Sequence, residues 1–166
     1  MAITSERLIE LETPDLNHKQ LVKQAANYLR NDIGLSVVIT ERTTQIEIPD
    51  VIGYRGGFSW LIECKASKAD FLADKKKLFR INPEQGIGYY RFYLAPINMI
   101  KVGELPENWG LIEVFNDEGK LRNIRAKDSQ PFYERNMQNE IAGLVSVMRR
   151  LQISATVFVT QDSEDK

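Results

Sequence analysis

The chain of 166 residues contains one cysteine and one histidine, and these two scarcities exclude several classes of protein. Because a disulfide needs two cysteines, Cys64 rules out a disulfide framework within the chain and fits a reducing compartment. A zinc site built from histidines is disfavoured, because His18 has no second histidine at ligand spacing. We therefore expect His18 on a helix surface and Cys64 as a small buried hydrophobic residue.

The sequence also lacks a long hydrophobic run and an excess of positive charge. No apolar stretch approaches the roughly 18 residues of a membrane span, and the first residues lack the profile of a signal peptide. We therefore expect a cytoplasmic protein with no membrane partner. The formal net charge of -1 gives no global signature of nucleic-acid binding, so any such contact must come from a local patch.

The length fits a single domain, which we place at residues 1–160, followed by a frayed acidic tail at 161–166. Alternating apolar residues and turn signals predict a series of strands, at 37–40, 46–54, 58–65, 89–95, 110–116, 120–125 and 153–160. A strand, a helix and a strand within residues 58–95 predict a right-handed crossover, so the strand at 89–95 should run parallel to the one at 58–65. The expected sheet is therefore mixed.

Three helices are predicted from apolar periodicity. The first follows the start signal at 13–15 and carries an apolar stripe of Leu16, Leu21, Val22, Ala25 and Leu29. The second begins at a capping box of Ser67 and Asp70 and should bury Phe71, Leu72, Leu78 and Phe79. The third, at 134–151, carries a single stripe of Met137, Ile141, Leu144, Val145, Met148 and Leu151.

Two carboxylates are expected to face each other across the hairpin at 46–65. Gly56-Gly57 is a two-residue turn signal. If these glycines form the turn, Arg55 pairs with Phe58, and continued pairing sets Asp50 opposite Glu63. Opposed residues lie about 5 Å apart on one face of the sheet, the face from which Lys65 also projects.

Two ionised carboxylates at that separation repel by about 3 kcal/mol at an effective dielectric constant near 20. A divalent cation, a shared proton or the Lys65 ammonium could offset this repulsion. An oxygen-only cluster suits a hard ion such as Mg²⁺ or Mn²⁺. The alternative is that Asp50 begins a turn and that Glu63 and Lys65 form an ordinary edge salt bridge. However, residues 58–62 are apolar on both faces, which argues for a buried strand.

The pattern Pro49-Asp50, a hairpin and then Glu63-Cys64-Lys65 resembles that of the PD-(D/E)XK nuclease superfamily. The resemblance covers about Leu16 to Ala95. It implies a three-layer α/β/α restriction-endonuclease-like core with a mixed central sheet. It also implies that Asp50 and Glu63 hold one or two Mg²⁺ ions with the carbonyl of Cys64, and that Lys65 positions and activates the attacking water.

The chain departs from the family on its first helix, where the family commonly places a further acidic residue. Residues 16–30 contain no Asp or Glu, and Glu41 and Glu47 are the nearest alternatives. Glu47 should point away from Asp50, because odd offsets face opposite sides of a strand. The missing acid favours a one-metal site or an inactive one.

Basic residues near the motif are candidate nucleic-acid contacts. In a nuclease, Lys68, Lys75 and Lys76 could contact phosphates beside the cleavage site, although a solvated helix face explains them equally well. Arg91 on the following strand could reach the cleft and stabilise the transition state, or it could pair with a carboxylate in the core.

Two functions are therefore carried forward from the sequence. The first is a Mg²⁺-dependent (or Mn²⁺-dependent) nuclease that hydrolyses phosphodiester bonds, with DNA as the expected substrate and RNA as the alternative. The second is a non-catalytic nucleic-acid-binding or protein-interaction module on the same fold. The Asp50, Glu63 and Lys65 set favours catalysis, whereas the first helix without acidic residues favours the module. Either protein is compatible with a homodimer.

Overall fold

A computed structural model of the chain describes residues 11–40 and 47–152. These residues form one open six-stranded sheet in the order β1-β2-β3-β4-β5-β6. The strands are β1 (Val37–Thr40), β2 (Val51–Arg55), β3 (Phe58–Cys64), β4 (Tyr90–Pro96), β5 (Gly110–Asp117) and β6 (Lys120–Lys127). β3, β4 and β5 run parallel to one another, whereas the β1/β2, β2/β3 and β5/β6 pairs are antiparallel. The predictions of a mixed sheet and of a parallel crossover between β3 and β4 are confirmed.

The hairpin of β2 and β3 has the predicted register, from Arg55 opposite Phe58 to Val51 opposite Ile62. The first strand begins at Val51, however, so the predicted start near residue 46 is wrong within the described residues 47–50. Pro49 has no N–H to donate to a sheet ladder, which explains why pairing starts after it. The argument that Glu47 points away from Asp50 by strand alternation therefore does not apply.

Helix α2 (His18–Asn27) begins later than predicted and continues into a π-helical turn at Tyr28–Asp32. Asn17 sets its start, because the Asn17 side chain accepts from the N–H of Gln20 and the Gln20 side chain accepts from the N–H of Asn17. This reciprocal capping box satisfies two of the N–H groups that a helix start leaves free. The apolar stripe predicted for this helix is buried, with members Leu16, Leu21, Val22, Ala25 and Leu29.

The predicted second helix is two short helices, α3 (Lys68–Asp74) and α4 (Leu78–Ile81). Ser67 caps α3 as predicted, accepting from the N–H of Asp70. The predicted buried stripe is wrong in part, because Phe71 is fully buried whereas Leu72 and Leu78 are exposed. The buried polar residue here is Asp74, which ends α3.

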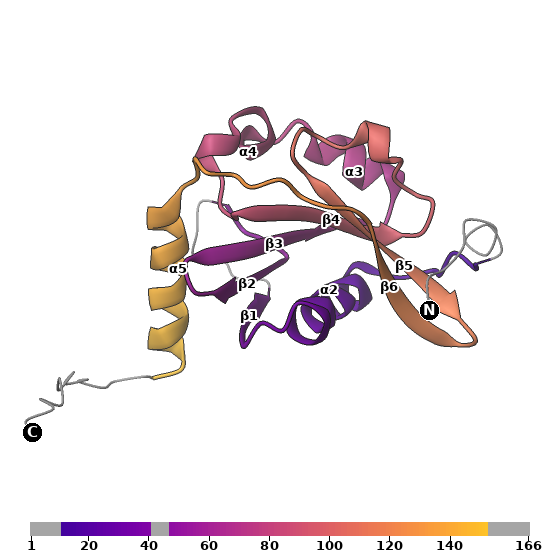
Figure 1. Cartoon of the computed structure of the whole chain (residues 1–166), viewed down its shortest axis with the longest axis horizontal. Coiled ribbons are helices and arrows are strands. Elements are labelled where there is room, and N and C mark those ends of the chain that lie inside the picture. The colour runs from indigo at the N-terminus through magenta and orange to yellow at the C-terminus, as the bar shows by residue number, and fades with distance from the viewer. Residues whose placement is uncertain (1–10, 41–46, 153–166) are drawn as a thin grey trace, which may run out of the picture.

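Helices cover both faces of the sheet, with α2 on one side and α3 and α4 on the other (Figure 1). Alternate residues of β3 divide between the two hydrophobic clusters, because successive side chains of a strand point to opposite faces. Trp60, Ile62 and Cys64 pack in the cluster with α2. Leu61 packs in the other cluster with Phe71 of α3. This alternation directs Glu63 towards α3 and α4.

Helix α5 (Met137–Arg150) stands at one end of the sheet (Figure 1). Its side towards the sheet contributes Glu140 and Gly143, which are buried, and Leu144 and Val147, which are partly buried against the second cluster. The strand predicted at 153–160, the tail at 161–166 and Glu41 lie outside the described residues.

Candidate active site

Asp50 lies one residue before β2, and the observed register extends to set it opposite Glu63. Its Oδ2 accepts a hydrogen bond from the backbone N–H of Cys64 at 2.7 Å. Its Oδ1 lies 3.3 Å from Nε2 of His18, at the start of α2. His18 is half-exposed, as expected for a helix surface, yet it contacts the candidate acid, which the sequence analysis did not foresee.

Glu63 and Lys65 project from the end of β3 towards α3. The Lys65 Nζ lies 3.3 Å from Oε2 of Glu63 and 3.1 Å from Oδ1 of Asp74. The side chains of Glu63 and Lys65 are both almost completely buried. The predicted buried strand is therefore confirmed, and the alternative of an edge salt bridge is excluded, because β3 lies between β2 and β4. Cys64 is buried in the opposite cluster, as predicted.

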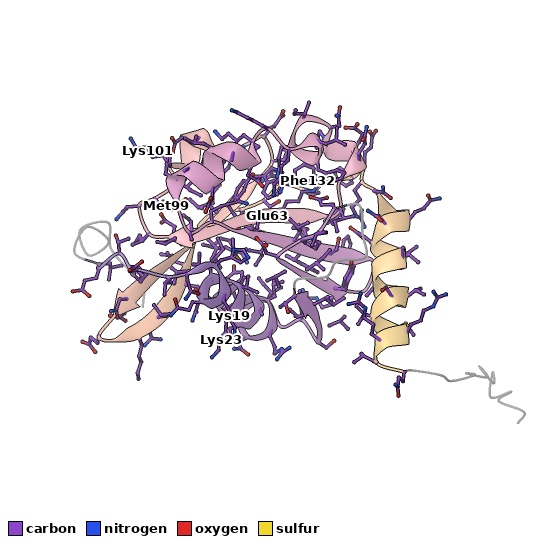
Figure 2. All side chains as sticks on the ribbon, turned by 180° about the vertical axis from the view of Figure 1, so that it is seen from behind. Lys19, Lys23, Glu63, Met99, Lys101 and Phe132 are labelled. Atoms are coloured by element: carbon purple, nitrogen blue, oxygen red, sulfur yellow. The ribbon has the colours of Figure 1, made fainter. Side chains whose placement is uncertain are left out.

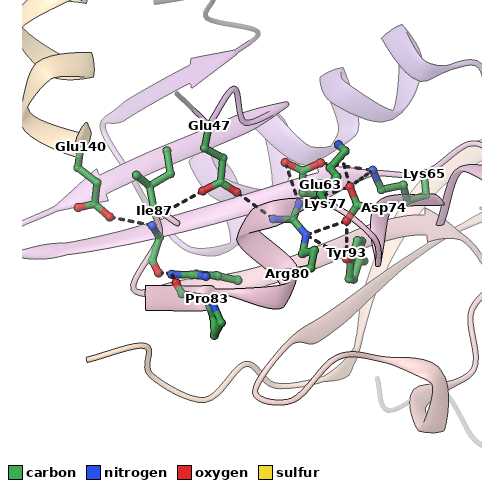
Figure 3. A network of polar contacts seen from close by, with 12 residues as sticks. Glu47, Glu63, Lys65, Asp74, Lys77, Arg80, Pro83, Ile87, Tyr93 and Glu140 are labelled. Atoms are coloured by element: carbon green, nitrogen blue, oxygen red, sulfur yellow. Dashed lines mark hydrogen bonds and ion pairs between the residues drawn. The ribbon is translucent and has the colours of Figure 1, made fainter. Parts of the chain in front are cut away.

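Arg80 of α4 connects three buried carboxylates (Figure 3). Its Nη1 lies 2.9 Å from Oε1 of Glu47, its Nη2 lies 3.4 Å from Oε1 of Glu63, and its Nε lies 2.7 Å from Oδ2 of Asp74. The Arg80 side chain is only 2% exposed. A guanidinium has five N–H donors in a fixed plane, which allows one side chain to serve several acceptors.

Asp74 is the most heavily paired carboxylate of this network. It accepts a hydrogen bond from the Tyr93 hydroxyl at 2.6 Å, and the Lys77 Nζ lies 2.8 Å from its Oδ1. Although burial alone would raise the pKa of Asp74, the neighbouring Arg80, Lys77, Tyr93 and Lys65 hold the pKa well below its usual range. Asp74 is thus ionised at neutral pH.

The pKa of Glu63 is raised to about 7, and burial is the largest cause. Arg80 and Lys65 lower this pKa, while the negative charges of Asp50 and Asp74 raise it. Desolvation and like-charge repulsion therefore outweigh the two cations at this position. The site therefore disfavours the ionised form of Glu63. Repulsion by the Asp50 carboxylate acts in the direction that the sequence analysis predicted.

A cavity of about 340 Å³ opens beside these residues. Its polar lining combines the motif residues with side chains of α2 and α3. The lining residues are His18, Ile48, Asp50, Glu63, Cys64, Lys65, Asp70, Ala73, Asp74 and Lys77. The structure therefore brings Asp50, Glu63, Cys64 and Lys65 to one cavity.

Oxygen donors in this cavity are of the kind that Mg²⁺ prefers. Within residues 11–40 and 47–152, no three side chains of His, Cys, Asp or Glu are grouped to hold a metal ion. Two carboxylates are nevertheless enough for Mg²⁺, which usually keeps several waters and takes further ligands from a substrate phosphate. Asp50 and Glu63, which both line the cavity, are the two carboxylates that the resemblance implies as ligands, with the Cys64 carbonyl as an additional donor.

The lysines predicted as phosphate contacts differ in what surrounds them. The ammonium of Lys68 pairs with Glu104 and donates to the carbonyl of Met99 at 3.2 Å. The Lys75 Nζ lies 4.9 Å from the centre of the Phe71 ring. Lys76 is exposed. Further cations, Lys19 and Lys23, point outward from α2, whereas Glu63 lies inside the molecule (Figure 2).

Arg91 is completely buried and does not line the cavity. Its Nε donates to the carbonyl of Gly88 and its Nη2 to the carbonyl of Pro83, both at 2.9 Å. Its guanidinium also lies 4.0 Å from the centre of the Phe132 ring. Burial lowers the pKa of Arg91 to about 10. Arg91 therefore braces the loop before β4 in this structure and is not presented to a ligand.

Sequence reasoning missed the roles of Asp74, Arg80 and Glu47. The only local signal was the spacing of Asp74, Lys77 and Arg80, which a break in the helix after Asp74 brings together. Glu47 also accepts from the N–H of Ile87 at 2.7 Å, a contact between distant segments that periodicity cannot indicate.

In the described part of the chain, no helix is both long and apolar enough to cross a membrane. Comparison of the chain with protein-family models, with curated proteins and with solved structures finds no match.

Proposed function

We propose that the protein is a Mg²⁺-dependent nuclease that hydrolyses phosphodiester bonds, with DNA as its substrate. The observation that carries the proposal is the convergence of Asp50, Glu63 and Lys65 on one cavity at the end of the β2/β3 hairpin. These residue types at these positions are the ones by which the sequence resembles the PD-(D/E)XK superfamily. A sheet with helices on both faces is compatible with the restriction-endonuclease-like core that the resemblance implies.

Each residue of the motif has a distinct role in this proposal. Asp50, Glu63 and the carbonyl of Cys64 would hold Mg²⁺, or Mn²⁺ in its place. The bound ion would act as a Lewis acid on the phosphate oxygens. Lys65, held between Glu63 and Asp74, would orient the attacking water or relay its proton.

The charge of the cluster is consistent with this role. Glu47, Asp50, Glu63 and Asp74 supply four carboxylates, whereas Lys65, Lys77 and Arg80 supply three basic side chains. Asp50 contacts the half-exposed His18 and the backbone N–H of Cys64, and none of these three basic side chains. A divalent cation would offset the remaining negative charge and the repulsion that raises the pKa of Glu63. A cytoplasmic location is part of the same proposal and is supported by the free thiol of Cys64, the single cysteine of the chain.

The nuclease proposal is tested by cleavage of supercoiled plasmid, single-stranded DNA and RNA in Mg²⁺, Mn²⁺ or chelator. We expect metal-dependent cleavage of DNA by the wild type and none by Asp50→Asn or Glu63→Gln. Lys120→Ala, which changes an exposed lysine of β6 outside the cavity, is the matched control and should keep most activity. Cleavage that persists in chelator, or in both acid variants, would exclude the proposed site.

A second candidate is a non-catalytic nucleic-acid-binding or protein-interaction module. It is favoured by the ion pairs of Glu63, whose two carboxylate oxygens lie within 3.3 Å and 3.4 Å of Lys65 and Arg80. Such a closed network could serve stability alone. This candidate predicts no cleavage by the wild type in any metal. In a mobility-shift assay, a nucleic-acid-binding module should bind DNA, whereas a protein-interaction module should not.

A further inference from the structure

Helix α5 exposes a row of apolar side chains in the described part of the chain. Five large apolar side chains of this segment are between 40% and 65% exposed. They are Met137, Ile141, Val145, Met148 and Leu151. A helix of a folded domain normally turns its apolar side to the core and its polar side to water, so this outward apolar side requires a partner.

The spacing of these residues is that of a helix pair. The exposed residues Met137, Ile141, Val145, Met148 and Leu151 follow one another at intervals of three or four residues, the spacing by which apolar residues line the seam between two packed helices. We call these five residues the α5 stripe, and Leu144 is not part of it because it packs against the second cluster. The α5 stripe contains no charged residue, and a nucleic acid would require cations. Its chemistry therefore fits another apolar helix.

The helix is already held in place for such a contact. Oε1 of Glu140 accepts from the Ser59 hydroxyl at 2.7 Å, from the Gly88 N–H at 2.8 Å and from Nε of Arg135 at 3.1 Å. An isolated helix of the 14 residues of α5 would be marginal in water. Because the sheet fixes this one, a partner does not have to bear the entropic cost of ordering it.

The charges at the two ends of α5 select the partner and its direction. Exposed Glu134 precedes the helix, and exposed Arg149 and Arg150 form its last turn. A second copy of α5 in antiparallel orientation would bring Glu134 of each chain towards Arg149 and Arg150 of the other. It would also oppose the two helix dipoles favourably. In a parallel pair the arginines of both copies would meet.

We propose that the α5 stripe is the interface of a homodimer, formed by an antiparallel pair of α5 helices around a two-fold axis near the middle of the helix. The contact is self-complementary, as a two-fold interface must be. A helix of 14 residues is about 21 Å long, so the pair buries less than a standard interface. The dimer should therefore be reversible and depend on concentration.

Sedimentation of the full-length chain between roughly 1 and roughly 300 µM tests the proposal, because weak interfaces dissociate in this range. We expect the average mass to rise from one chain of 19.1 kDa towards two. The double variant Ile141→Glu/Met148→Glu should weaken association at least about tenfold. Ala142→Glu, an exposed position on α5 outside the stripe, is the control and should associate like the wild type.

Disulfide crosslinking tests the direction, because the native Cys64 is buried. Val145→Cys, near the proposed axis, should form a covalent dimer on mild oxidation, whereas Met137→Cys, near one end, should not. Equal crosslinking of both would indicate a parallel pair and overturn the arrangement.

A wild type that stays monomeric throughout would overturn the dimer itself. If the double variant then had a lower melting temperature, another segment of the same chain would be the occupant of the stripe. If its melting temperature were unchanged, the stripe would instead serve a different protein.

Discussion

The carboxylate of Asp50 accepts a hydrogen bond from the backbone N–H of Cys64 at 2.7 Å. This bond ties the residue before β2 to the end of β3, so the first acid of the candidate site is held against the strand that carries the second acid and Lys65. The geometry of the site therefore depends on the hairpin register. Four consequences can be measured.

Metal binding should depend on both acids and on pH. We expect Mn²⁺ binding measured by calorimetry to be weakened severely by Asp50→Asn and by Glu63→Gln. Because a proton on Glu63, whose pKa is about 7, competes with the ion, affinity should fall about tenfold for each pH unit below 7. Affinity that is independent of pH between 5.5 and 8, or unchanged in both variants, would contradict the assigned ligands.

Glu63→Gln should stabilise the metal-free protein at alkaline pH. The pKa of Glu63 is raised from 4.5 to about 7, so the folded state binds more protons than the unfolded state between these values. Stability therefore falls as the pH rises through this window, by up to roughly 3 kcal/mol. In chelator at pH 8 the variant should be more stable than the wild type, with little difference at pH 4.5.

Urea denaturation across this pH range, with Glu107→Gln as an exposed control, measures the effect. Excess Mg²⁺ should raise the melting temperature of the wild type and leave that of Glu63→Gln nearly unchanged. A variant less stable than the wild type at pH 8 would mean that Glu63 serves mainly as the ion-pair partner of Lys65 and Arg80.

Lys65→Ala should retain metal binding but lose most nuclease turnover. A protonated lysine cannot be a metal ligand, and groups that position water or transfer protons typically contribute about 10²–10⁴ in rate. Lys65→Arg should not restore turnover, because a guanidinium does not deprotonate and has a different donor geometry. Cleavage rates are compared with those of Lys120→Ala, and full activity in Lys65→Ala would exclude this role.

Arg80→Met should be among the most destabilising substitutions outside the hydrophobic core. It leaves Glu47, Glu63 and Asp74 without the cation that they share, and removal of one partner of a buried ion pair typically costs about 3–5 kcal/mol. Arg80→Lys should recover only part of this loss, because an ammonium cannot reach three carboxylates in one plane. Urea denaturation, with Arg30→Met as an exposed control, measures the cost, and a loss below about 1 kcal/mol would show that the network is not structural.

The parts of the fold that follow from local rules were predictable from the sequence. A two-residue glycine turn determines the pairing of its two strands, and this register alone sets Asp50 opposite Glu63. Strand alternation likewise separates Cys64 from Glu63 and Lys65, and the short crossover implies the parallel pairing of β3 with β4. Each of these relationships depends on hydrogen bonds or periodicity between residues close in sequence.

Tertiary structure alone determined which charged side chains contact one another in the interior and which apolar faces are exposed to solvent. Arg80 joins Glu47 to Glu63 and Asp74 because the chain breaks its helix after Asp74 and turns back over the sheet, and no period in the sequence encodes that path. The same holds for Arg91, whose guanidinium lies over Phe132, a residue distant in sequence. In α5, periodicity indicates an apolar stripe, but only the packing of Glu140 and Gly143 against the sheet determines that most of this stripe faces outward. Such contacts depend on where separate elements come together in space, which local propensities do not determine.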